Sequence, residues 1–500
     1  MDKRKNIAVI GAGLGGLAAA IRLAAAGYKV DVYEKNSQPG GKANQIFNNG
    51  FRFDTGPSLL TMPFVIEELF NDVDERIEDY LELIKLDIAC KYFYPDETIL
   101  SAYSDLNKFA GEFENRTRDK ADSIIRFFSY SKNIYNLTAD LFLFKSFSEL
   151  KTFINLKSLK TLLSFRKIDA FRTMHEAISS FFIDNRTIQF FDRYATYNGS
   201  NPYLAPATLN IIPHVEHNPG AFLPIGGIYK LTKALYKLTL KKGAQIFFNH
   251  DVKKILVEGN RVKGIAFATN ENITNKKYDV IISNADVNST YKYLLGADST
   301  KQAKKYNLLE PSSSALVFYW GVKGQFDLLE THNVLFSADY KKEFDELFVE
   351  KKCPDDPTIY IYISAKKNKN DAPDGFENWY VMINAPYNSG QDWEKGTVRM
   401  RDKVINKINR LIGVNLSDKI VFENILTPVD IEKNTGSFRG SLYGVSSNSR
   451  YSAFRRQQNR SKDFRGLYFC GGSAHPGGGI PLVILSGKIT AELITKYEHM

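Results

Sequence analysis

The sequence predicts an α/β fold, in which a Rossmann-like dinucleotide-binding domain is interrupted by an α+β insertion. Two observations lead to this prediction. Near the start of the chain, a short apolar run at residues 6–10 leads into a turn at residues 11–16 with the spacing G-x-G-x-x-G. This is the order of strand, turn and helix that such domains use. Near the end, the apolar run 466–470 leads into a second glycine-rich turn at residues 471–479. We therefore expect a binding domain that is assembled from both ends of the chain.

The helix after the first turn is predicted by the spacing of its apolar residues. These recur every three or four positions, as one buried helix face requires, at Leu14, Leu17, Ala18, Ile21 and Ala25. Gly27 is expected to end this helix. Residues 29–33 then predict a second buried strand, with Glu34 at its carboxyl end.

The glycines of the turn, the start of the helix and Glu34 each have a physical role in binding a dinucleotide. Gly11 permits the tight turn, Gly13 lets the backbone approach a pyrophosphate, and Gly16 allows close contact between helix and strand. The helix N-terminus offers unpaired N–H groups and a positive dipole to phosphates. Glu34 can accept hydrogen bonds from a ribose diol and disfavours a 2′-phosphate. The whole unit therefore predicts a dinucleotide site.

The middle of the chain predicts a further part of this domain and a separate sheet. A helix is expected at residues 228–240. Strands of the binding domain are expected at 245–248, 252–257, 261–267 and 280–283, with a turn at 258–260. Strands of the insertion, rich in aromatic and branched residues, are expected at 316–322, 358–364 and 379–385. The charged stretch 366–371 is expected to be a solvated loop.

Charge and cysteine content indicate the partners and the compartment. The 500-residue chain has a net charge of +10, which attracts polyanions such as nucleic acid or an anionic lipid surface. No nucleic-acid-binding motif is present, so a membrane surface is the favoured partner and nucleic acid is not expected. The alternative is that the charge serves only solubility. Three cysteines without a CxxC pair argue against a disulfide framework or a structural zinc site and fit a reducing cytosol.

Residues 141–172 form an unusual basic and aromatic stretch. It is rich in phenylalanine, lysine and arginine and contains only two acidic residues, Glu149 and Asp169. Such a stretch can lie in a membrane interface, with its cations on lipid phosphates and its rings among acyl chains. We expect a membrane-contacting helical region here, and a cytoplasmic protein that associates peripherally with the inner membrane. A helical lid with an apolar core face is the alternative.

Further motifs carry a resemblance to a known family. Residues 39–43 and 51–58 resemble the flavoprotein group that includes amine oxidases and carotenoid desaturases. The C-terminal turn, with His-Pro-Gly-Gly-Gly-Ile-Pro at residues 475–481, resembles the signature of the phytoene-desaturase-type carotenoid desaturases. The resemblance covers nearly the whole chain and includes residues 197–202, 222–227 and 283–286. Within that family, the C-terminal turn is most similar to the bacterial 1-hydroxycarotenoid 3,4-desaturase branch.

The resemblance implies FAD as the cofactor and a division into two domains. The FAD-binding domain would comprise residues 1–75, 222–300 and 460–500, and the substrate-binding domain residues 76–221 and 301–459. The backbone at Val252 would meet the adenine side, and no metal site is implied. The implied cofactor-binding residues are Gly11, Gly13, Leu14, Gly15, Gly16, Glu34, Lys35, Gly41, Lys42, Gly56, Pro57, Ser58, Leu59, Val252, Asn284, Gly472, Gly479, Ile480 and Pro481.

The implied reaction is the desaturation of a long-chain carotenoid, with a hydride passing from a C–H bond to FAD. Because the resulting cation is delocalised along the polyene, a weak base suffices to remove the proton. His214 and Glu216 are the candidate proton acceptors, and in a strand they would share one face; a structural role for both is the alternative. A quinone or oxygen would then reoxidise the flavin.

Four other functions remain open at this point. The chain could be a phytoene desaturase that acts on phytoene, or an FAD amine oxidase, which would need an aromatic cage for the amine near the flavin. It could also be an isoprenoid-carrying escort protein of related fold, although the intact glycine turns and Glu34 argue against this. It could finally be an isomerase of the desaturase family, which uses FAD without net oxidation. Sequence motifs distinguish such isomerases poorly from the desaturases.

Overall fold

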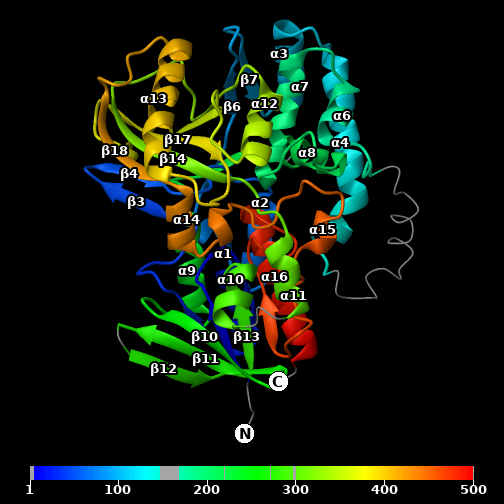
Figure 1. Cartoon of the computed structure of the whole chain (residues 1–500), viewed down its shortest axis with the longest axis vertical. Helices are drawn as coiled ribbons and strands as arrows, with labels where there is room; N and C mark the ends of the chain where they lie inside the picture. The colour runs from blue at the N-terminus through cyan, green and yellow to red at the C-terminus, as the bar shows by residue number, and fades with distance from the viewer. Residues whose placement is uncertain (1–4, 147–167, 219, 271, 297–299, 499–500) are drawn as a thin grey trace.

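The computed structural model describes residues 5–146, 168–218, 220–270, 272–296 and 300–498. In Figure 1 these residues form two halves, and the chain passes between them several times. The lower half contains the beginning and the end of the described chain around a parallel sheet. The upper half contains a larger, mostly antiparallel sheet and a group of helices beside it.

The sheet of the lower half takes its strands from three distant parts of the chain. Its order is β19-β13-β1-β2-β9, and every neighbouring pair is parallel. The strands are β1 (Asn6–Ile10), β2 (Lys29–Tyr33), β9 (Gln245–Phe247), β13 (Val280–Ser283) and β19 (Leu467–Phe469). The predicted α/β fold with a Rossmann-like unit is therefore confirmed.

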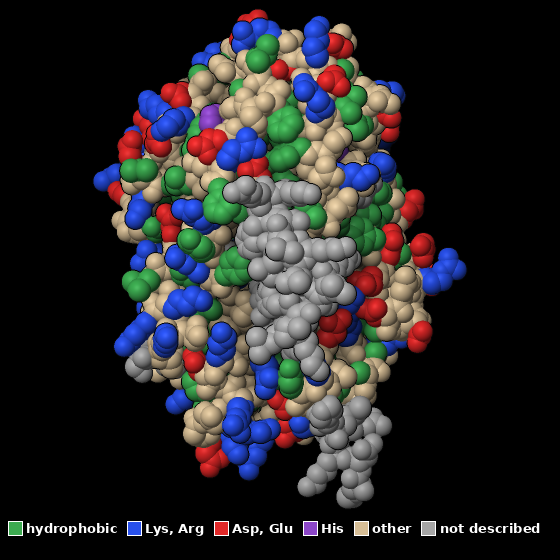
Figure 2. All heavy atoms as spheres, turned by 90° about the vertical axis from the view of Figure 1, so that its right-hand side faces the viewer, with side chains coloured by type: hydrophobic (Ala, Val, Ile, Leu, Met, Phe, Trp, Pro, Cys, Tyr) green, Lys and Arg blue, Asp and Glu red, His purple; other side chains and the backbone are tan. Residues whose placement is uncertain are grey.

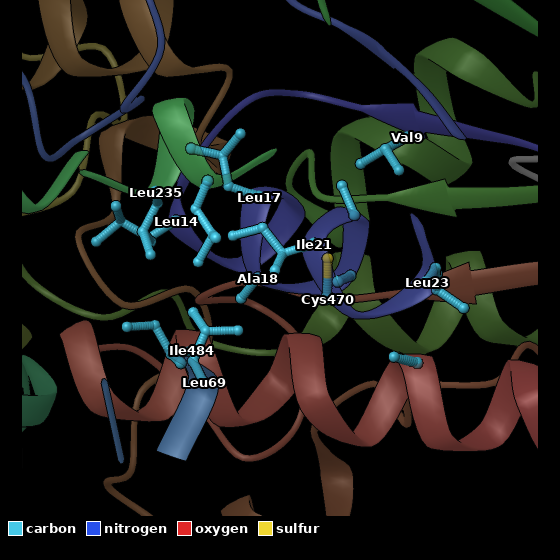
Figure 3. Close-up of a cluster of buried hydrophobic side chains, with 14 of the residues drawn as sticks. Val9, Leu14, Leu17, Ala18, Ile21, Leu23, Leu69, Leu235, Cys470 and Ile484 are labelled. Atoms are coloured by element: carbon cyan, nitrogen blue, oxygen red, sulfur yellow. The ribbon is translucent and has the colours of Figure 1, made fainter. Parts of the chain in front are cut away.

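Helices cover one face of this parallel sheet. They are α1 (Leu14–Ala25), α2 (Pro63–Asn71), α9 (Tyr229–Lys241) and α16 (Ile480–Tyr497). Figure 3 shows side chains of α1 between the other three helices, with Leu69 of α2, Leu235 of α9 and Ile484 of α16 nearby. Full burial of each such side chain contributes about 1.5–3 kcal/mol, so this cluster fixes α1 against the sheet.

The other face of the sheet packs against a three-stranded antiparallel meander. Its strands are β10 (Asp251–Glu258), β11 (Arg261–Thr269) and β12 (Asn272–Lys277). Alternate residues of the parallel strands face it: Ala8 and Ile10 lie in the core on this side, while Ile7 and Val9 lie in the core under the helices. This alternation follows from the two-residue period of a strand, and it explains why these strands are apolar throughout.

The upper half is built on a seven-stranded sheet of order β18-β14-β17-β16-β15-β6-β7, antiparallel except for the pair β15–β6. Helix α13 (Trp393–Ile412) packs on one face of it. The strands are β6 (Ile88–Phe93), β7 (Ile99–Tyr103), β14 (Ser314–Lys323), β15 (His332–Leu335), β16 (Ile359–Ile363), β17 (Phe376–Ala385) and β18 (Ile420–Leu426).

The remaining elements connect and cover these sheets. Two small sheets pair β3 (Gln45–Asn48) with β4 (Phe51–Asp54), and β5 (Leu83–Lys85) with β8 (Phe222–Pro224). The other helices are α3 (Leu106–Arg116), α4 (Ala121–Phe142), α6 (Met174–Ser179), α7 (Asn185–Asp192), α8 (Ile211–His217), α10 (Val287–Ser289), α11 (Lys301–Leu308), α12 (Tyr340–Asp345), α14 (Pro428–Thr435) and α15 (Ser452–Arg455). Short 3-10 and π segments are η1 (Ile77–Asp79), η3 (Arg193–Asn198), η4 (Ala207–Asn210), η5 (Thr290–Leu294), η6 (Glu346–Glu350), η7 (Ser364–Lys366), η8 (Lys369–Asp371) and η9 (Phe438–Gly440).

The prediction of a solvated loop at residues 366–371 holds for Lys367, Lys369 and Asn370, which are exposed, but it is wrong for Asp371. The segment ends in the helical turn η8, and the Asp371 carboxylate is 1 % exposed. Arg52 of β4 donates to it through Nε (2.6 Å to Oδ1) and Nη2 (2.6 Å to Oδ2). Arg52 also donates to Asp54 through Nη1 at 2.9 Å. The local charge pattern misleads because the partner of Asp371 lies in a distant part of the sequence.

The predicted membrane-contacting region, residues 141–172, lies mostly outside the described residues. Among the described part, Phe171 is 70 % exposed. In the face that Figure 2 shows, basic and hydrophobic side chains both lie on the described surface. No helix within the described ranges is both long and apolar enough to cross a membrane.

Candidate active site

A cavity of about 1360 Å³ extends from the glycine-rich turns of the lower half to the sheet of the upper half. It is lined by all of the predicted cofactor-binding residues except Gly16. Both glycine-rich turns, the segment 55–59 and the start of β10 therefore border one space. Sequence segments that are hundreds of residues apart meet here because the parallel sheet places the carboxyl ends of β1, β2, β13 and β19 at one edge.

The first glycine-rich turn has the tight geometry that its spacing predicts. Gly11 has φ +95°, a conformation that L side chains rarely adopt, and its N–H donates to the carbonyl oxygen of Tyr33 at 2.8 Å. Gly16 lies behind the turn, where a Cβ atom would approach the carbonyl oxygen of Gly11 to 2.3 Å. Gly16 therefore shapes the turn without lining the cavity.

Glu34 lies at the end of β2 with its carboxylate in the cavity wall. Its Oε2 accepts the N–H of Ala12 at 2.8 Å, and its Oε1 accepts the N–H of Asn36 at 3.0 Å. Its Oε1 also accepts the Nδ2–H of Asn36 at 2.9 Å. Since each carboxylate oxygen can accept two hydrogen bonds, Oε2 keeps capacity for one ribose hydroxyl. The same side chain thus braces the glycine turn and offers one acceptor to a ribose hydroxyl.

Two helices direct their N-termini at this cavity. Gly13 and Leu14 at the start of α1, and Gly479 and Ile480 at the start of α16, all line it. Unpaired N–H groups and the positive ends of both helix dipoles favour anionic groups there. A Cβ atom added to Gly479 would meet no protein atom within 4 Å, so its backbone is open to a ligand. These features fit a ligand with a diphosphate.

Lys42 supplies a cation between the two turns. Its Nζ donates to the carbonyl oxygens of Ser441 (3.0 Å) and Leu442 (2.6 Å). Burial lowers the pKa of Lys42 to about 8, and the carboxylate of Asp286 opposes this shift. Both residues line the cavity. Because the pKa of Lys42 lies just above neutral pH, the side chain is still mostly protonated there and can pair with an anionic ligand.

Arg456 is a structural residue of this site that the sequence did not indicate. Its Nη1 donates to the carbonyl oxygens of Tyr443 (3.0 Å) and Gly472 (2.9 Å), and its Nη2 donates to that of Val445 (3.1 Å). It therefore ties the C-terminal glycine turn to residues 443–445. No local pattern could have identified it, because all of its acceptors are backbone atoms brought near by the fold.

The upper part of the cavity is lined by apolar and tyrosine side chains. Val317, Tyr319, Tyr360, Tyr380 and Tyr443 contribute to it. The Tyr360 hydroxyl lies 2.6 Å from Ser58 Oγ and 2.7 Å from His332 Nδ1. This connection joins the predicted flavin-side segment to the upper sheet. The apolar and aromatic part of this wall, which also contains polar residues such as Asn384 and Asn424, can exclude water from a long hydrocarbon.

The expectation that His214 and Glu216 share a strand face is wrong. Both lie in helix α8, where side chains two positions apart point to different sides. Glu216 lines the cavity, whereas His214 is not among its lining residues and packs against Tyr135 with ring centroids 5.1 Å apart. Burial and the nearby charge of Lys132 lower the pKa of His214.

Glu216 belongs to a buried polar cluster. Its Oε1 accepts the hydroxyl of Tyr194 at 2.8 Å, and its Oε2 accepts that of Tyr197. Arg193 donates to the hydroxyls of Tyr92 (2.5 Å) and Tyr197 (3.5 Å). Tyr197 therefore bridges a buried cation and a buried anion, and Arg193, Tyr197 and Glu216 all border the cavity.

Comparisons with known proteins agree with this geometry. Residues 14–495 match the model of the family described as flavin containing amine oxidoreductase. The chain is 42% identical over 490 residues to a 1-hydroxycarotenoid 3,4-desaturase of Flavobacterium sp.. The aligned region covers 98% of this chain and 99% of that protein. It is 34% identical over 496 residues to a 4,4'-diaponeurosporene oxygenase of Staphylococcus haemolyticus, with 99% and 98% covered.

Solved structures share the fold at low identity. A redesigned putrescine oxidase superimposes with a TM-score of 0.66 at 12% identity and covers 99% of each chain. An oxidoreductase from Methanosarcina mazei gives a TM-score of 0.65 at 17% identity, covering 97% of this chain and 100% of that one. These likenesses support the two-half architecture described above.

Proposed function

This chain belongs to the flavin-containing amine oxidoreductase family and is an FAD-dependent oxidoreductase, and from this we propose that it desaturates a carotenoid, at C-3,4 of a 1-hydroxycarotenoid. The main structural support is the continuity of one cavity, which joins dinucleotide-binding turns to an apolar, tyrosine-lined wall. The similarity to a 1-hydroxycarotenoid 3,4-desaturase over almost the whole length of both proteins supports the choice of substrate.

The residues present fit FAD. We assign its diphosphate to the N–H groups of Gly13 and Leu14, its ribose to Glu34, and further anionic contacts to the start of α16. The adenine would lie beside Val252 of β10. FAD bound in this way supplies a two-electron acceptor for a hydride.

The protein's own part in the reaction is to align the polyene and to keep water away. Two hydrogens leave adjacent carbons, one as a hydride and one as a proton. The apolar wall around Val317 and Tyr319 would hold the polyene in one orientation. This orientation lowers the entropic cost of bringing the reacting atoms together. Of the two candidate proton acceptors, only Glu216 lines the cavity, and we retain it as the proposed acceptor.

The substrate and the final electron acceptor suggest where the protein works. A carotenoid is confined to lipid, so we propose peripheral association with the inner membrane from the cytoplasmic side, through residues 141–172. The net charge of +10 supports an anionic lipid surface as the partner and no nucleic acid is invoked. A membrane quinone or oxygen would reoxidise the flavin.

Two alternatives have specific support and are separated by the same experiment. The first alternative is desaturation of phytoene, which the resemblance of residues 475–481 to the phytoene-desaturase-type enzymes suggests. Amine oxidation would use an aromatic cage, for which Tyr319, Tyr380 and Tyr443 in the cavity wall are candidates.

The chain would be produced in cells that accumulate phytoene, and in cells that accumulate an acyclic 1-hydroxylated carotenoid that is saturated at C-3,4.

The expected result is a product with a longer absorption wavelength only in the cells that contain the 1-hydroxylated carotenoid. Conversion of phytoene would replace the proposed substrate with phytoene. If neither carotenoid changes and the purified yellow protein releases peroxide from amines, the proposed function is wrong and the amine oxidase alternative holds.

A further inference from the structure

We propose that Tyr197 removes the proton from the polyene and passes its own hydroxyl hydrogen to Glu216. The inference rests on the proposed function and adds the residue through which the substrate proton reaches the proposed acceptor. Tyr197 lies in η3 and Glu216 in α8, and both side chains line the cavity. We call this pair the Tyr197–Glu216 relay.

Glu216 alone is poorly placed to meet a substrate. It is only 2 % exposed, and each of its oxygens already accepts a tyrosine hydroxyl, Oε1 from Tyr194 and Oε2 from Tyr197. Tyr197 is half-buried, and its hydroxyl is joined to Glu216 and Arg193, which line the cavity with it. Tyr197 is therefore the accessible end of the pair, and the carboxylate is the buried end.

The hydrogen bonds leave the Tyr197 oxygen able to accept a proton. The hydroxyl donates its only hydrogen to Glu216 Oε2, and it accepts from Arg193 Nη2 at 3.5 Å. A hydroxyl oxygen has two lone pairs and can accept two hydrogen bonds. Among the residues that the structure describes, Arg193 is the only donor to this oxygen. One acceptor position is therefore open.

The segment that carries Tyr197 lies beside the C-terminal glycine-rich turn. A Cβ atom added to Gly199 would approach the Tyr443 ring to 2.9 Å, and one added to Gly478 would approach the same ring to 2.7 Å. Tyr443 therefore packs between this segment and the turn at residues 471–479. The relay thus borders the part of the cavity that is next to a cofactor-binding turn.

The charges around Tyr197 keep it a neutral hydroxyl before the reaction. Burial and the negative charge of Glu216 raise the pKa of Tyr197, and the positive charge of Arg193 opposes this shift. A neutral hydroxyl is a weak base, but a polyene cation is a strong acid. The hydroxyl suffices as the acceptor because its own hydrogen can leave toward a carboxylate.

The relay accounts for the proton of the proposed reaction. One C–H bond breaks with its electron pair, and this hydride goes to bound FAD, which is reduced as the polyene is oxidised. The C–H bond of the adjacent carbon then breaks, its electron pair forms the new double bond, and its proton goes to the Tyr197 oxygen. The original Tyr197 hydrogen moves to Glu216 Oε2, so the step leaves a neutral tyrosine and a protonated carboxyl group.

The test follows one turnover of the holoenzyme, in detergent and without oxygen, on an acyclic 1-hydroxylated carotenoid. The product is measured by its longer absorption wavelength. We expect Tyr197→Phe to slow product formation roughly 100-fold, the lower end of what a positioned general base contributes. Tyr194→Phe is the matched control, because Tyr194 donates to the same carboxylate at 2.8 Å but does not line the cavity.

Deuterium identifies the step that Tyr197 assists. The carotenoid is deuterated at each of the two reacting carbons in turn. In Tyr197→Phe, deuterium at the carbon that loses the proton should slow product formation more than it does in the wild type, because proton removal then limits the rate. Tyr194→Phe should keep the wild-type isotope effects, whatever its rate. A variant that only misplaces the polyene would slow hydride transfer, and this isotope effect would not grow.

Infrared difference spectra of the same turnover show where the proton goes. We expect the carbonyl band of a protonated carboxyl group to appear in the wild type and in Tyr194→Phe. The band should be absent in Tyr197→Phe, and its absence in Glu216→Gln would assign it to Glu216. This measurement reports on the carboxyl group itself and does not depend on the rate of product formation.

The outcomes separate the relay from the proposed function. If Tyr197→Phe and Tyr194→Phe give equal rates and equal isotope effects, the relay is wrong, although a wild type that desaturates the carotenoid keeps the proposed function. A wild type that forms product without the carboxyl band also overturns the relay. If the wild type leaves the carotenoid unchanged, the proposed function fails and the relay fails with it.

Discussion

Contacts of the order of 3 Å determine whether the first glycine-rich turn can form. A side chain at Gly16 would collide with the backbone oxygen of Gly11 at 2.3 Å, and the backbone cannot move without opening the turn. A Cβ atom at Gly13 would meet only the side chain of Asn284, with Nδ2 at 2.8 Å and Cγ at 3.9 Å. Asn284 can rotate away. The two glycines therefore have different consequences when replaced.

We expect Gly16→Ala to lower the melting temperature of the protein and to reduce its flavin content together, because α1 would be pushed away from the strand. Gly13→Ala should fold with a melting temperature near that of the wild type when FAD is removed from both. Gly13→Val should fold and bind no FAD, because the larger side chain occupies the approach to the diphosphate. Thermal unfolding of the apoproteins and flavin absorbance check this. A yellow, fully active Gly13→Val protein would contradict the assigned role of Gly13.

Lys42 gives the site a pH dependence. Burial lowers the pKa of Lys42 from the usual 10.5 to about 8, with Asp286 acting in the opposite direction. Because FAD is anionic, it binds the protonated lysine better. The FAD affinity of the apoprotein should therefore fall as pH rises above about 8, by at most about tenfold per pH unit if one proton is taken up.

Titration of the apoprotein with FAD between pH 7 and 10 measures this effect. Lys42→Arg should bind FAD with an affinity that is nearly independent of pH, since arginine stays charged throughout. The free energy of unfolding of the apoprotein should change in the opposite direction. Because the pKa of Lys42 is lower in the folded than in the unfolded protein, the apoprotein should gain stability from this group as pH rises from about 8 to about 10.5. A parallel decline of FAD affinity in both proteins would assign the pH dependence to another group.

Pairs of elements are joined by buried contacts that connect the two halves. The Arg52 guanidinium of β4 binds Asp371 of η8, and it also binds Asp54, whose carboxylate accepts the N–H groups of Ile228 (3.1 Å) and Tyr229 (3.0 Å) at the start of α9. One cluster thus fixes a strand, a helix of the lower half and a turn of the upper half.

We expect Asp371→Ala to destabilise the protein by about 3–5 kcal/mol, the usual cost of leaving a buried charge without its partner. The free energy of unfolding, measured with denaturant, checks this. Asp374→Ala is the matched control, because Asp374 is exposed and lies in the same connection. Equal stability of the two variants would show that Arg52 finds sufficient compensation in Asp54 alone.

The whole molecule combines a net charge of +10 with a substrate that we propose to be confined to lipid. We expect the holoprotein to bind vesicles that contain anionic lipid, and to be released as salt rises. Replacement of Lys151, Lys157 and Lys160 by Gln should weaken vesicle binding by roughly 100-fold, at about 1 kcal/mol for each lysine near the surface.

Sedimentation with vesicles measures this binding. The control replaces Lys253, Lys254 and Lys263, which are exposed on the β10–β11 hairpin, and removes the same charge from a different surface. If both triple variants bind equally, the attraction belongs to the net charge of the molecule and residues 141–172 have no special part in it.

Predictions from sequence succeeded where the determining contacts are local. The strand, turn, helix and second strand over residues 6–33 lie in one continuous segment, and their spacing is dictated by hydrogen bonds and packing within it. The hairpin turn at residues 258–260 was found for the same reason. The glycine pattern could also indicate a phosphate-binding turn, because only glycine tolerates that backbone.

Predictions failed where a residue's role depends on a distant partner. Asp371 looked solvated, yet it is buried against Arg52, 319 residues away in sequence. His214 and Glu216 were placed on one face because a strand was assumed, and the helix α8 separates them. Arg456 has no local signature at all, because its acceptors are distant backbone oxygens.

By itself, the sequence determined the α/β fold, the dinucleotide turn and the family, since each is encoded by short-range spacing of glycines and apolar residues. The tertiary structure decided which charges are buried, which of the candidate proton acceptors reaches the cavity, and which distant segments border it. The physical reason is that burial and electrostatic pairing depend on distances in space, and the folded chain brings together residues such as Arg52 and Asp371 whose separation in sequence carries no such information.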